Sequence, residues 1–483
     1  MKMIIDSELR EAADGSVIDV INPATREKID TVPSGTISDI EQAVYAAQHA
    51  KKLMCKTPAH QRAAILSRVA QSMEDMHEEL ARLLTQENGK PIIQTREEIN
   101  AAIRIFRGFT EESKRIFGRA CSLDMVPGME KHFAFTIRQP LGVIAAIVPF
   151  NYPVELYAHK AAAALAAGNA VIVKPPSECP LTLLRIAMLI EEAGIPRAAH
   201  QVVTGPGESI GEFLAQSPVI QMISLTGSVE VGLRVSNLAA NSLKKVHLEL
   251  GGNDPMIICA DADLEKAAEA VILGRLARGN GQICCAVKRI FIDSKVYNTF
   301  SEILTEKTKN LKVGDPMDEE TDVGPLISEK AAIKVESLIN NAVEKGAKLT
   351  IGGRRQRAYI HPAVLIDVPT DTPLFCDETF GPVAPLVSFK NIDEAIEKAN
   401  NSSYALQSAV FTRDFAKALN VAYRLNTGGV IVNWSSAVRV ENLPFGGLKM
   451  SGHGRESIHD TLLEMTEQKS ILLYDALSVF RSP

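Results

Sequence analysis

The sequence contains no strongly basic stretch and no long uninterrupted apolar segment. Its 483 residues carry a formal net charge of −6, whereas a surface that binds nucleic acid or anionic lipid needs a positive field. The most apolar helix-like run, at about residues 154–167, includes Glu155, His159 and Lys160 and is too short to cross a bilayer. We therefore expect no nucleic-acid or membrane partner, and we expect the chain to bind small molecules and other subunits.

The sequence also lacks a secretion signal and a metal-binding pattern. Acidic residues appear as early as Asp6 and no apolar core follows them, which predicts a cytoplasmic protein. The seven cysteines are scattered, odd in number and free of C-x-x-C pairs or Cys/His clusters. This distribution indicates free thiols in a reducing compartment and predicts no metal site.

The most regular feature is an alternation of apolar strands with helices between residues 142 and 250. Strand-like runs lie at about 143–148, 170–173, 201–203, 222–225 and 246–250. Such alternation builds a parallel, doubly wound sheet, whose ligand crevice lies at the carboxyl ends of the strands. The usual dinucleotide-binding glycine pattern is absent, and Gly205-Pro206-Gly207 with Gly211 is a weak substitute that is also compatible with a simple turn.

The other segments predict a second α/β domain and peripheral elements. Further strand-like runs lie near residues 256–258, 289–292, 383–389 and 409–411. Residues 1–35 predict an edge sheet, and residues 38–117 predict helices that begin with a capping box at Ser38-x-x-Glu41. Residues 119–140 predict a β-hairpin. No flexible linker separates these parts, so we expect closely apposed domains.

Two short stretches contain residue types that suit covalent catalysis. Residues 279–285, Gly-Asn-Gly-Gln-Ile-Cys-Cys, form a glycine-containing turn between a helical and a strand-like run. Such a turn can expose Cys284, which becomes a nucleophile where its pKa is lowered. Glu249 follows a mostly apolar strand, and partial burial there would raise its pKa toward that of a useful base. The alternatives are a buried packing cysteine and an exposed charge at a strand end.

Both stretches resemble signatures of the aldehyde dehydrogenase superfamily, a Glu-Leu-Gly-Gly segment and a Gly-Gln-x-Cys segment. Five more motifs occur in the family's order: Pro149-Phe150-Asn151-Tyr152-Pro153, Val173-Lys174-Pro175-Pro176, Leu225-Thr226-Gly227-Ser228, Glu378-Thr379-Phe380-Gly381-Pro382 and Pro444-Phe445-Gly446-Gly447. Together the motifs cover nearly the whole chain. The resemblance implies an α/β fold with a doubly wound parallel cofactor-binding sheet, a second α/β catalytic domain and a small β oligomerisation element.

The resemblance also implies where these parts lie. The dinucleotide-binding domain would comprise residues 1–118 and 141–250, and the catalytic domain residues 251–449. The oligomerisation element would comprise residues 119–140 and 450–483, and the assembly would be a homodimer or homotetramer.

The activity implied by the resemblance is the oxidation of an aldehyde through a thioester. An aldehyde carbon releases hydride usefully only after a nucleophile has made it tetrahedral, and the Cys284 thiolate would be that nucleophile. The Asn151 amide and the Cys284 backbone N–H would hold the oxyanion, although Asn before Tyr-Pro is also a good turn residue. Glu249 would activate the water that hydrolyses the thioester, a base that coenzyme-A-acylating relatives lack. Cys285 is expected to be a packing residue rather than a redox partner.

The resemblance further implies a nicotinamide cofactor. Lys174 would reach the adenosine ribose, and the third residue after it bears on the choice of cofactor. Relatives that prefer NAD often have glutamate there, whereas Ser177 could donate a hydrogen bond to a 2′-phosphate, so we favour NADP over NAD. If the loop shifted by one residue, Glu178 would take that position and the preference would be for NAD. The expected cofactor-binding residues are Pro149, Lys174, Ser177, Gly207, Gly227, Ser228, Glu378 and Phe380.

The expected substrate is a small polar or anionic aldehyde. His159 stands where many relatives carry a large aromatic residue beside the aldehyde tunnel, and Arg439 could pair with a carboxylate or phosphate. Arg107, one turn after Arg104, could add to a cationic face, although a solvated face is the alternative. The expected substrate-binding residues are His159, Arg439, Phe445 and Arg107.

Succinate semialdehyde and lactaldehyde are the leading substrates. Non-phosphorylating glyceraldehyde-3-phosphate dehydrogenases are similar here but carry a phosphate-binding arginine where this chain has Ile283, which weakens that possibility. The sequence also leaves open a coenzyme-A-acylating enzyme and a non-catalytic protein with the same fold.

Overall fold

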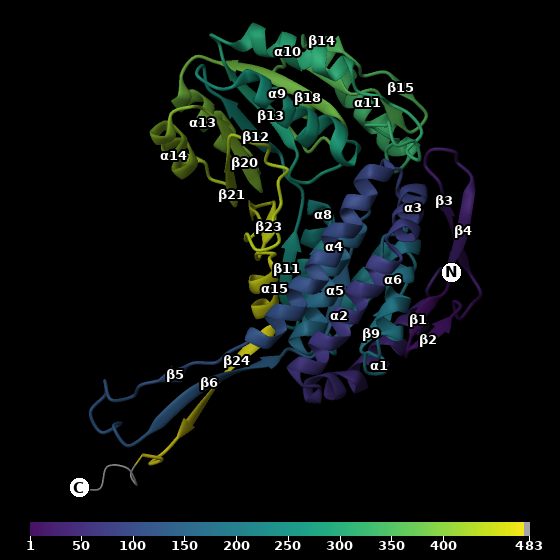
Figure 1. Cartoon of the computed structure of the whole chain (residues 1–483), viewed down its shortest axis with the longest axis vertical. Helices are drawn as coiled ribbons and strands as arrows, with labels where there is room; N and C mark the ends of the chain where they lie inside the picture. Colours follow the sequence, from purple (N-terminus) through teal and green to yellow (C-terminus); the bar gives the residue numbers. More distant parts are fainter. Residues whose placement is uncertain (478–483) are drawn as a thin grey trace.

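Two β-sheets organise the chain, and a β arm projects from the part that contains the first sheet (Figure 1). The computed structural model describes residues 1–477. The first sheet has the order β2-β1-β9-β8-β7-β10-β11-β23. Its strands from β9 to β11 are parallel, which confirms the predicted doubly wound sheet, and β1, β2 and β23 pair antiparallel at its edges. The bounds are β1 (Met3–Ile5), β2 (Glu8–Arg10), β7 (Val143–Ile147), β8 (Ala170–Lys174), β9 (His200–Val202), β10 (Met222–Thr226), β11 (Lys245–Glu249) and β23 (Gly452–His453).

Helices pack against this sheet and bury its apolar strands in one continuous core. The predicted capping box is two residues too late: Thr36 caps the first helix and Asp39 closes the box. The Asp39 carboxylate also accepts the Ala13 N–H at 3.2 Å, so a tertiary contact favours this register. The helices are α1 (Ile37–Lys56), α2 (Ala59–Asp75), α3 (His77–Asn88), α4 (Ile92–Glu112), α5 (Pro153–Ala167), α6 (Leu181–Glu192), α7 (Gly207–Gln216) and α8 (Val229–Ala240).

The second sheet has the order β14-β17-β18-β13-β12-β20-β21 and is parallel except for β14. Two apolar clusters pack against it. Its strands are β12 (Asp254–Ile258), β13 (Val287–Asp293), β14 (Lys348–Ile351), β17 (Ala363–Ile366), β18 (Val383–Phe389), β20 (Gln407–Phe411) and β21 (Gly429–Val432). Its helices are α9 (Leu264–Val271), α10 (Tyr297–Lys309), α11 (Glu329–Glu344), α12 (Pro373–Cys376), α13 (Ile392–Asn400) and α14 (Phe415–Arg424).

The arm is a three-stranded antiparallel sheet of the order β24-β6-β5. Its strands are β5 (Ala120–Cys121), β6 (Phe133–Pro140) and β24 (Thr466–Leu473), so the predicted hairpin does pair with a C-terminal strand. The preceding β23 and α15 (Ile458–Glu464) pack on the first sheet and its helices instead of joining the arm. Residues 478–483 of the predicted oligomerisation element lie outside the described residues.

Short elements complete the fold. The pair β3 (Val17–Ile21) and β4 (Lys28–Pro33) forms its own small sheet, separate from β1 and β2. The other short pieces are the 3₁₀ turn Ser113–Arg115 and the strands β15 (Arg355–Gln356), β16 (Tyr359–Ile360), β19 (Tyr404–Ala405) and β22 (Leu448–Lys449). Within residues 1–477, no helix is both long enough and apolar enough to cross a membrane.

The two sheets meet where the chain passes from β11 directly to β12. Glu249 is the last residue of β11, Asn151 follows β7 closely, and Cys284 shortly precedes β13. The carboxyl ends of parallel strands are the usual place for a ligand crevice, and the turns that carry these residues bring them to that junction.

Candidate active site

An irregular turn positions Cys284. Helix α9 continues into a π-helical segment, Ile272–Ala277, and a 3₁₀ turn, Arg278–Gly281. Gly279, Asn280 and Gly281 all have positive φ, at 58°, 54° and 73°. Side chains other than glycine and asparagine rarely adopt this region, and buried Asn280 is held there by its amide, which donates to the carbonyls of Gly89 (3.1 Å) and Pro325 (2.8 Å). The turn is therefore rigid.

Contacts between the sequence motifs fix the turn further. A Cβ on Gly281 would lie 2.4 Å from the carbonyl carbon of Gly381, so the cysteine turn packs directly on the Glu378–Pro382 motif. A Cβ on Gly251 would lie 2.4 Å from Glu378 Oε2. Glycine is needed at both places because the backbones approach so closely.

Lys288 connects the same motifs by hydrogen bonds, although it was not among the residues expected from the sequence. Its buried ammonium donates to the carbonyls of Gly252 (2.7 Å) and Cys284 (2.6 Å) and to Glu378 Oε1 (2.7 Å). A signal was present, because a lysine inside an otherwise apolar strand needs partners. The contact with the Cys285 thiol and burial raise the pKa of Cys284, and the Lys288 charge opposes that rise.

Glu249 is buried, with 2% of its surface exposed. Burial raises its pKa, and neither carboxylate oxygen has a hydrogen-bond partner among residues 1–477. Gly446 leaves room for it, because a Cβ there would lie 2.8 Å from Glu249 Oε1. An unpartnered buried carboxylate at the end of a strand is suited to acting on a water molecule or a substrate.

The expected cofactor residues line the carboxyl end of the first sheet. Burial lowers the pKa of Lys174 to about 8, and its ammonium donates to Ser177 Oγ at 3.2 Å. Ser177 donates in turn to the Gly205 carbonyl at 3.1 Å. A Cβ on Gly207, the first residue of α7, would lie 3.5 Å from Lys174 Nζ. Glu178 is exposed.

The remaining expected cofactor residues lie at the same junction. Ser228 caps α8 by accepting the Val231 N–H at 3.3 Å, and the Gly227 N–H donates to the Glu249 carbonyl at 3.0 Å. The Phe380 ring contacts the Phe150 ring edge-on at 5.9 Å, and Pro149 is half-buried in the loop after β7. Helices α7 and α8 both begin at this end of the sheet, and helix N-termini are suited to binding the phosphates of a dinucleotide.

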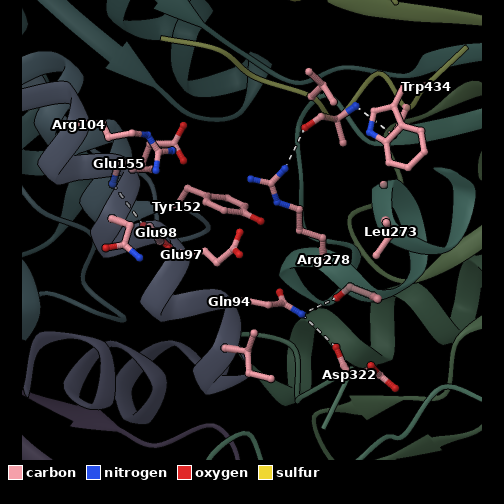
Figure 2. Close-up of a pocket in the computed structure, with 18 of the residues that line it drawn as sticks. Gln94, Glu97, Glu98, Arg104, Tyr152, Glu155, Leu273, Arg278, Asp322 and Trp434 are labelled. Atoms are coloured by element: carbon pink, nitrogen blue, oxygen red, sulfur yellow. Dashed lines mark hydrogen bonds between the residues drawn. The ribbon is translucent and has the colours of Figure 1, made fainter. Parts of the chain in front are cut away.

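A cavity of about 510 Å³ lies between α4, the start of α5, the π-helical segment and the loop at 434–438 (Figure 2). Arg278 extends into it toward the Tyr152 ring, with the guanidinium carbon 5.7 Å from the ring centroid, and donates to the Ala437 carbonyl at 3.2 Å. Tyr152 and Ala437 also belong to the apolar cluster that contains Cys284. The cavity therefore borders the apolar cluster that contains the cysteine.

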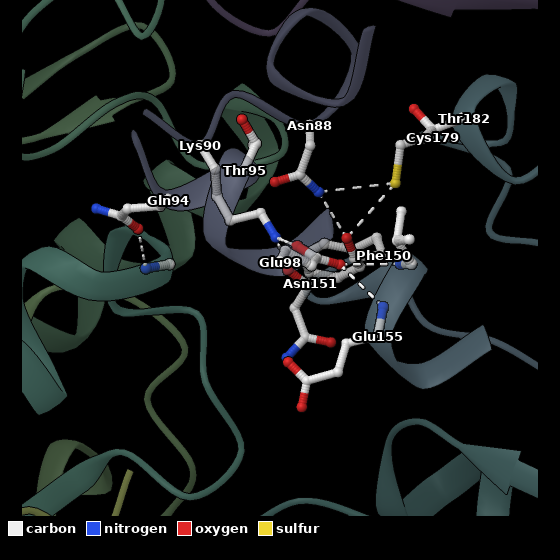
Figure 3. A network of polar contacts seen from close by, with 12 residues as sticks. Asn88, Lys90, Gln94, Thr95, Glu98, Phe150, Asn151, Glu155, Cys179 and Thr182 are labelled. Carbon is white, nitrogen blue, oxygen red and sulfur yellow. Dashed lines mark hydrogen bonds and ion pairs between the residues drawn. The ribbon is translucent and has the colours of Figure 1, made fainter. Parts of the chain in front are cut away.

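A polar network fixes Asn151 in the loop between β7 and α5 (Figure 3). Its amide donates to the Gln282 carbonyl, two residues before Cys284, at 3.0 Å. Lys90 donates to the Asn151 carbonyl at 2.9 Å and pairs with buried Glu98. Asn88 donates to the Phe150 carbonyl at 2.6 Å. Since an amide NH₂ has two hydrogens, the second remains for a ligand beside the cysteine.

None of the four expected substrate residues lines this cavity, and their role in binding the substrate stays a prediction. Arg107 pairs with Glu74 on the exposed surface at 2.6 Å, whereas Arg104 lines the cavity and pairs with Glu441 at 2.7 Å. His159 is a fully buried residue of α5 and packs against Phe109 of α4, at 6.5 Å between ring centroids. Burial lowers its pKa well below the ordinary value.

Arg439 is the third of these residues. It pairs with buried Glu456 and lies 3.6 Å from Glu155 Oε1, and its guanidinium is 4.6 Å from the Phe445 ring centroid. A buried guanidinium needs such carboxylates, so its charge is already compensated. Phe445 itself packs in the cluster that contains Cys284.

Comparison with known proteins agrees with this geometry. Residues 10–471 match the aldehyde dehydrogenase family. The 3-sulfolactaldehyde dehydrogenase of Priestia aryabhattai is 41% identical over 456 residues, 94% of each chain. The lactaldehyde dehydrogenase of Methanocaldococcus jannaschii is 39% identical over 98% of this chain and 100% of its own length. The crystal structure of an E. coli NADP-dependent enzyme superposes with a TM-score of 0.95, at 36% identity and 98% coverage of both chains. The chain therefore belongs to the aldehyde dehydrogenase family and is an enzyme that oxidises aldehydes to carboxylic acids with NAD or NADP.

Proposed function

We propose that this enzyme oxidises a small polar or anionic aldehyde through a thioester on Cys284. The cavity borders the apolar cluster that contains this cysteine, the Asn151 amide donates to the turn before it, and Glu249 is the last residue of β11. The Cys284 thiolate adds to the aldehyde carbon, and the Asn151 amide together with the Cys284 backbone N–H stabilises the resulting oxyanion.

Glu249 acts after the oxidation. The thioester must be hydrolysed, and a buried carboxylate with a raised pKa is a stronger base than an exposed one. Glu249 takes a proton from water, the hydroxide attacks the thioester carbon, and the Cys284 thiolate leaves as the carboxylic acid forms. The presence of Glu249 as a base also supports hydrolysis of the thioester over transfer of its acyl group to coenzyme A.

The cofactor that fits best is NADP. Lys174, Ser177 and Gly207 come together at the end of β8 and the start of α7, and Ser177 occupies the place where an acidic residue would repel a 2′-phosphate. Ser228, Gly227, Glu378, Phe380 and Pro149 would hold the rest of the dinucleotide. When bound, the nicotinamide accepts the hydride that the substrate carbon releases.

Arg278 is the observation that supports an anionic substrate. It lines the cavity, and no carboxylate of the described residues forms an ion pair with it. An arginine with an unpaired charge in a substrate cavity can bind a carboxylate or sulfonate by two parallel hydrogen bonds. The relatives named above act on 3-sulfolactaldehyde and on lactaldehyde, so we propose a short aldehyde with a hydroxyl, sulfonate or carboxylate group. Succinate semialdehyde also has this chemistry.

We also propose that the arm forms a subunit interface in a homodimer or homotetramer. Strand β24 leaves Leu472 and Leu473 exposed, at 51% and 44%, and Tyr474 beside it is 71% exposed. Apolar side chains on a projecting strand are typical of an interface.

The Arg278→Gln variant tests the substrate proposal. We expect its KM for 3-sulfolactaldehyde and succinate semialdehyde to rise about tenfold or more, equivalent to about 1.4 kcal/mol, with little change for neutral lactaldehyde. Arg107→Gln is the matched control, because Arg107 lies on α4 outside the cavity, and its constants should stay near those of the parent enzyme. An equal change for charged and neutral aldehydes in Arg278→Gln would rule out anion binding by Arg278.

A further inference from the structure

His247 and Glu249 lie on the same face of β11, because side chains two residues apart in a strand point the same way. His247 is fully buried. Its Nε2 lies 3.6 Å from Glu249 Oε1, and its Nδ1 contacts Glu464 Oε2 at the end of α15. A histidine thus stands between the proposed base and a second carboxylate.

Two glycines allow this close packing. A Cβ on Gly454, where φ is 103°, would lie 2.7 Å from His247 Nδ1 and 3.2 Å from Glu464 Oε2. A Cβ on Gly446 would lie 2.8 Å from Glu249 Oε1. A residue other than glycine at 446 or 454 would displace these side chains, so the close packing of His247, Glu249 and Glu464 requires both glycines.

The outer end of the arrangement reaches the protein surface. The Glu464 side chain is 35% exposed and lines a cavity of about 400 Å³ with His453, Lys244 and Lys245. This cavity shares no lining residue with the aldehyde cavity. Solvent can therefore stabilise the Glu464 carboxylate, whereas Glu249 is 2% exposed.

Charges from other elements do not replace His247. Glu456 and Arg439 also act on Glu249, with opposite signs, and Arg439 is already paired with Glu456. Lys160 pairs with the same Glu456 at 2.9 Å, and His159 is a further buried neighbour of that group. His247 directly faces the Glu249 carboxylate at 3.6 Å, and that carboxylate has no hydrogen-bond partner among residues 1–477.

We propose that His247, held in its charged form by Glu464, keeps the buried Glu249 ionised and so sets the lower pH limit of thioester hydrolysis. His247 is a positioning residue in this scheme, since it acts through Glu249, and the idea rests on the proposed role of Glu249 as the base. An ionised carboxylate out of water needs an opposite charge. Burial lowers the pKa of His247, but its contacts with Glu249 and Glu464 outweigh burial and raise the pKa to about 9.

The sign of the pH effect follows from the charges. A cation near Glu249 favours its ionised form, so loss of that cation raises the Glu249 pKa. Glu249 is then protonated, and inactive as a base, over a wider pH range. In a plot of the hydrolysis rate against pH, the acidic limb should therefore move to higher pH. At pH values well above the new limb, the rate should equal that of the parent enzyme.

The direct test measures the decay of the Cys284 thioester across pH by quenched mass spectrometry of the full-length enzyme after one turnover with NADP and an accepted aldehyde. In His247→Gln we expect the thioester still to form. At pH 7 its decay should slow by about tenfold for each pH unit by which the acidic limb moves. At high pH the decay rate should return to that of the parent enzyme. Glu464→Gln, at a partly exposed site, should shift the limb in the same direction by less. Glu467→Gln is the control, since this exposed residue pairs with Lys245 at the same sheet edge.

Two outcomes would overturn the proposal: a His247→Gln profile that superimposes on that of the parent enzyme, or a loss of rate by the same factor at every pH. The reference variant Glu249→Gln separates this proposal from the one it rests on. If Glu249→Gln hydrolyses its thioester normally, Glu249 is not the base and the proposed function fails. If Glu249→Gln cannot hydrolyse the thioester but His247→Gln behaves like the parent enzyme, only the role of His247 is wrong.

Discussion

The buried interior of the turn that carries Cys284 and the cavity beside it are built in opposite ways. Inside the turn, buried groups from distant motifs contact one another directly, as when Lys288 joins the carbonyls of Gly252 and Cys284 to Glu378. In the cavity, Arg104 projects from α4 and Arg278 from the start of the turn, each with few partners. A side chain that points into the cavity can therefore change with less effect on the fold than a group packed inside the turn. The chemistry is fixed by the scaffold, and the substrate depends on a few replaceable residues.

The largest effect should come from removing the nucleophile. Cys284→Ala should lower kcat with any aldehyde by on the order of 10⁴-fold or more, because no other group can form the thioester. Cys285→Ala is the matched control and should retain kcat within about threefold, since Cys285 is buried in the packed cluster. Steady-state assays of reduced nicotinamide would check both variants, and comparable losses in the two would mean that the thiols share the chemistry.

A smaller but distinct effect should follow from adding one methyl group to the turn. Gly281→Ala should lower the free energy of unfolding by about 3 kcal/mol, because the methyl group would overlap the Gly381 backbone and φ is positive. Gly15→Ala has nearly the same φ, 74°, but no atom within 4 Å, and it should cost only about 1 kcal/mol. Denaturant unfolding measures both values. Equal losses would show that backbone conformation, and not the contact between motifs, constrains the turn.

The smallest expected change concerns cofactor choice. Ser177→Glu should shift the ratio of kcat/KM for NADP over NAD by about tenfold toward NAD, because a carboxylate beside Lys174 repels a 2′-phosphate. Glu178→Gln should leave the ratio within about twofold, since Glu178 is exposed. Should Glu178→Gln instead improve NADP use strongly, Glu178 would be the acid that faces the ribose. A parent enzyme with more than a tenfold preference for NAD would refute the NADP proposal.

The sequence predicts the fold and the nucleophile turn well, because both depend on local signals. The alternation of apolar strands with helices predicts the parallel strands from β9 to β11, and glycines at 279 and 281 mark the left-handed turn. The family resemblance then predicts that Asn151 and Cys284 come close, and the Asn151 amide does donate to the Gln282 carbonyl, two residues before Cys284.

The substrate residues are harder to predict, because an arginine's role depends on partners that are distant in the sequence. Arg439 and Arg278 look equivalent in sequence, yet Glu456 and Glu155 neutralise the first and no described carboxylate pairs with the second. The capping box at Thr36 is hard to predict for a similar reason, since Asp39 also binds the Ala13 N–H. The role of His247 is likewise recognisable only when its three-dimensional neighbours are known, and for Lys288 the sequence indicates a need for partners but not which groups they are.

The most direct test of the central claim is to trap the covalent intermediate. The Glu249→Gln enzyme, mixed with NADP and an accepted aldehyde and then quenched, should carry one acyl group on the peptide that contains Cys284, and it should release reduced nicotinamide in a single turnover. Fragmentation of that peptide distinguishes Cys284 from Cys285. An acyl group on Cys284 is the result expected from this mechanism. A full turnover of reduced nicotinamide with no acyl group on Cys284 would contradict it.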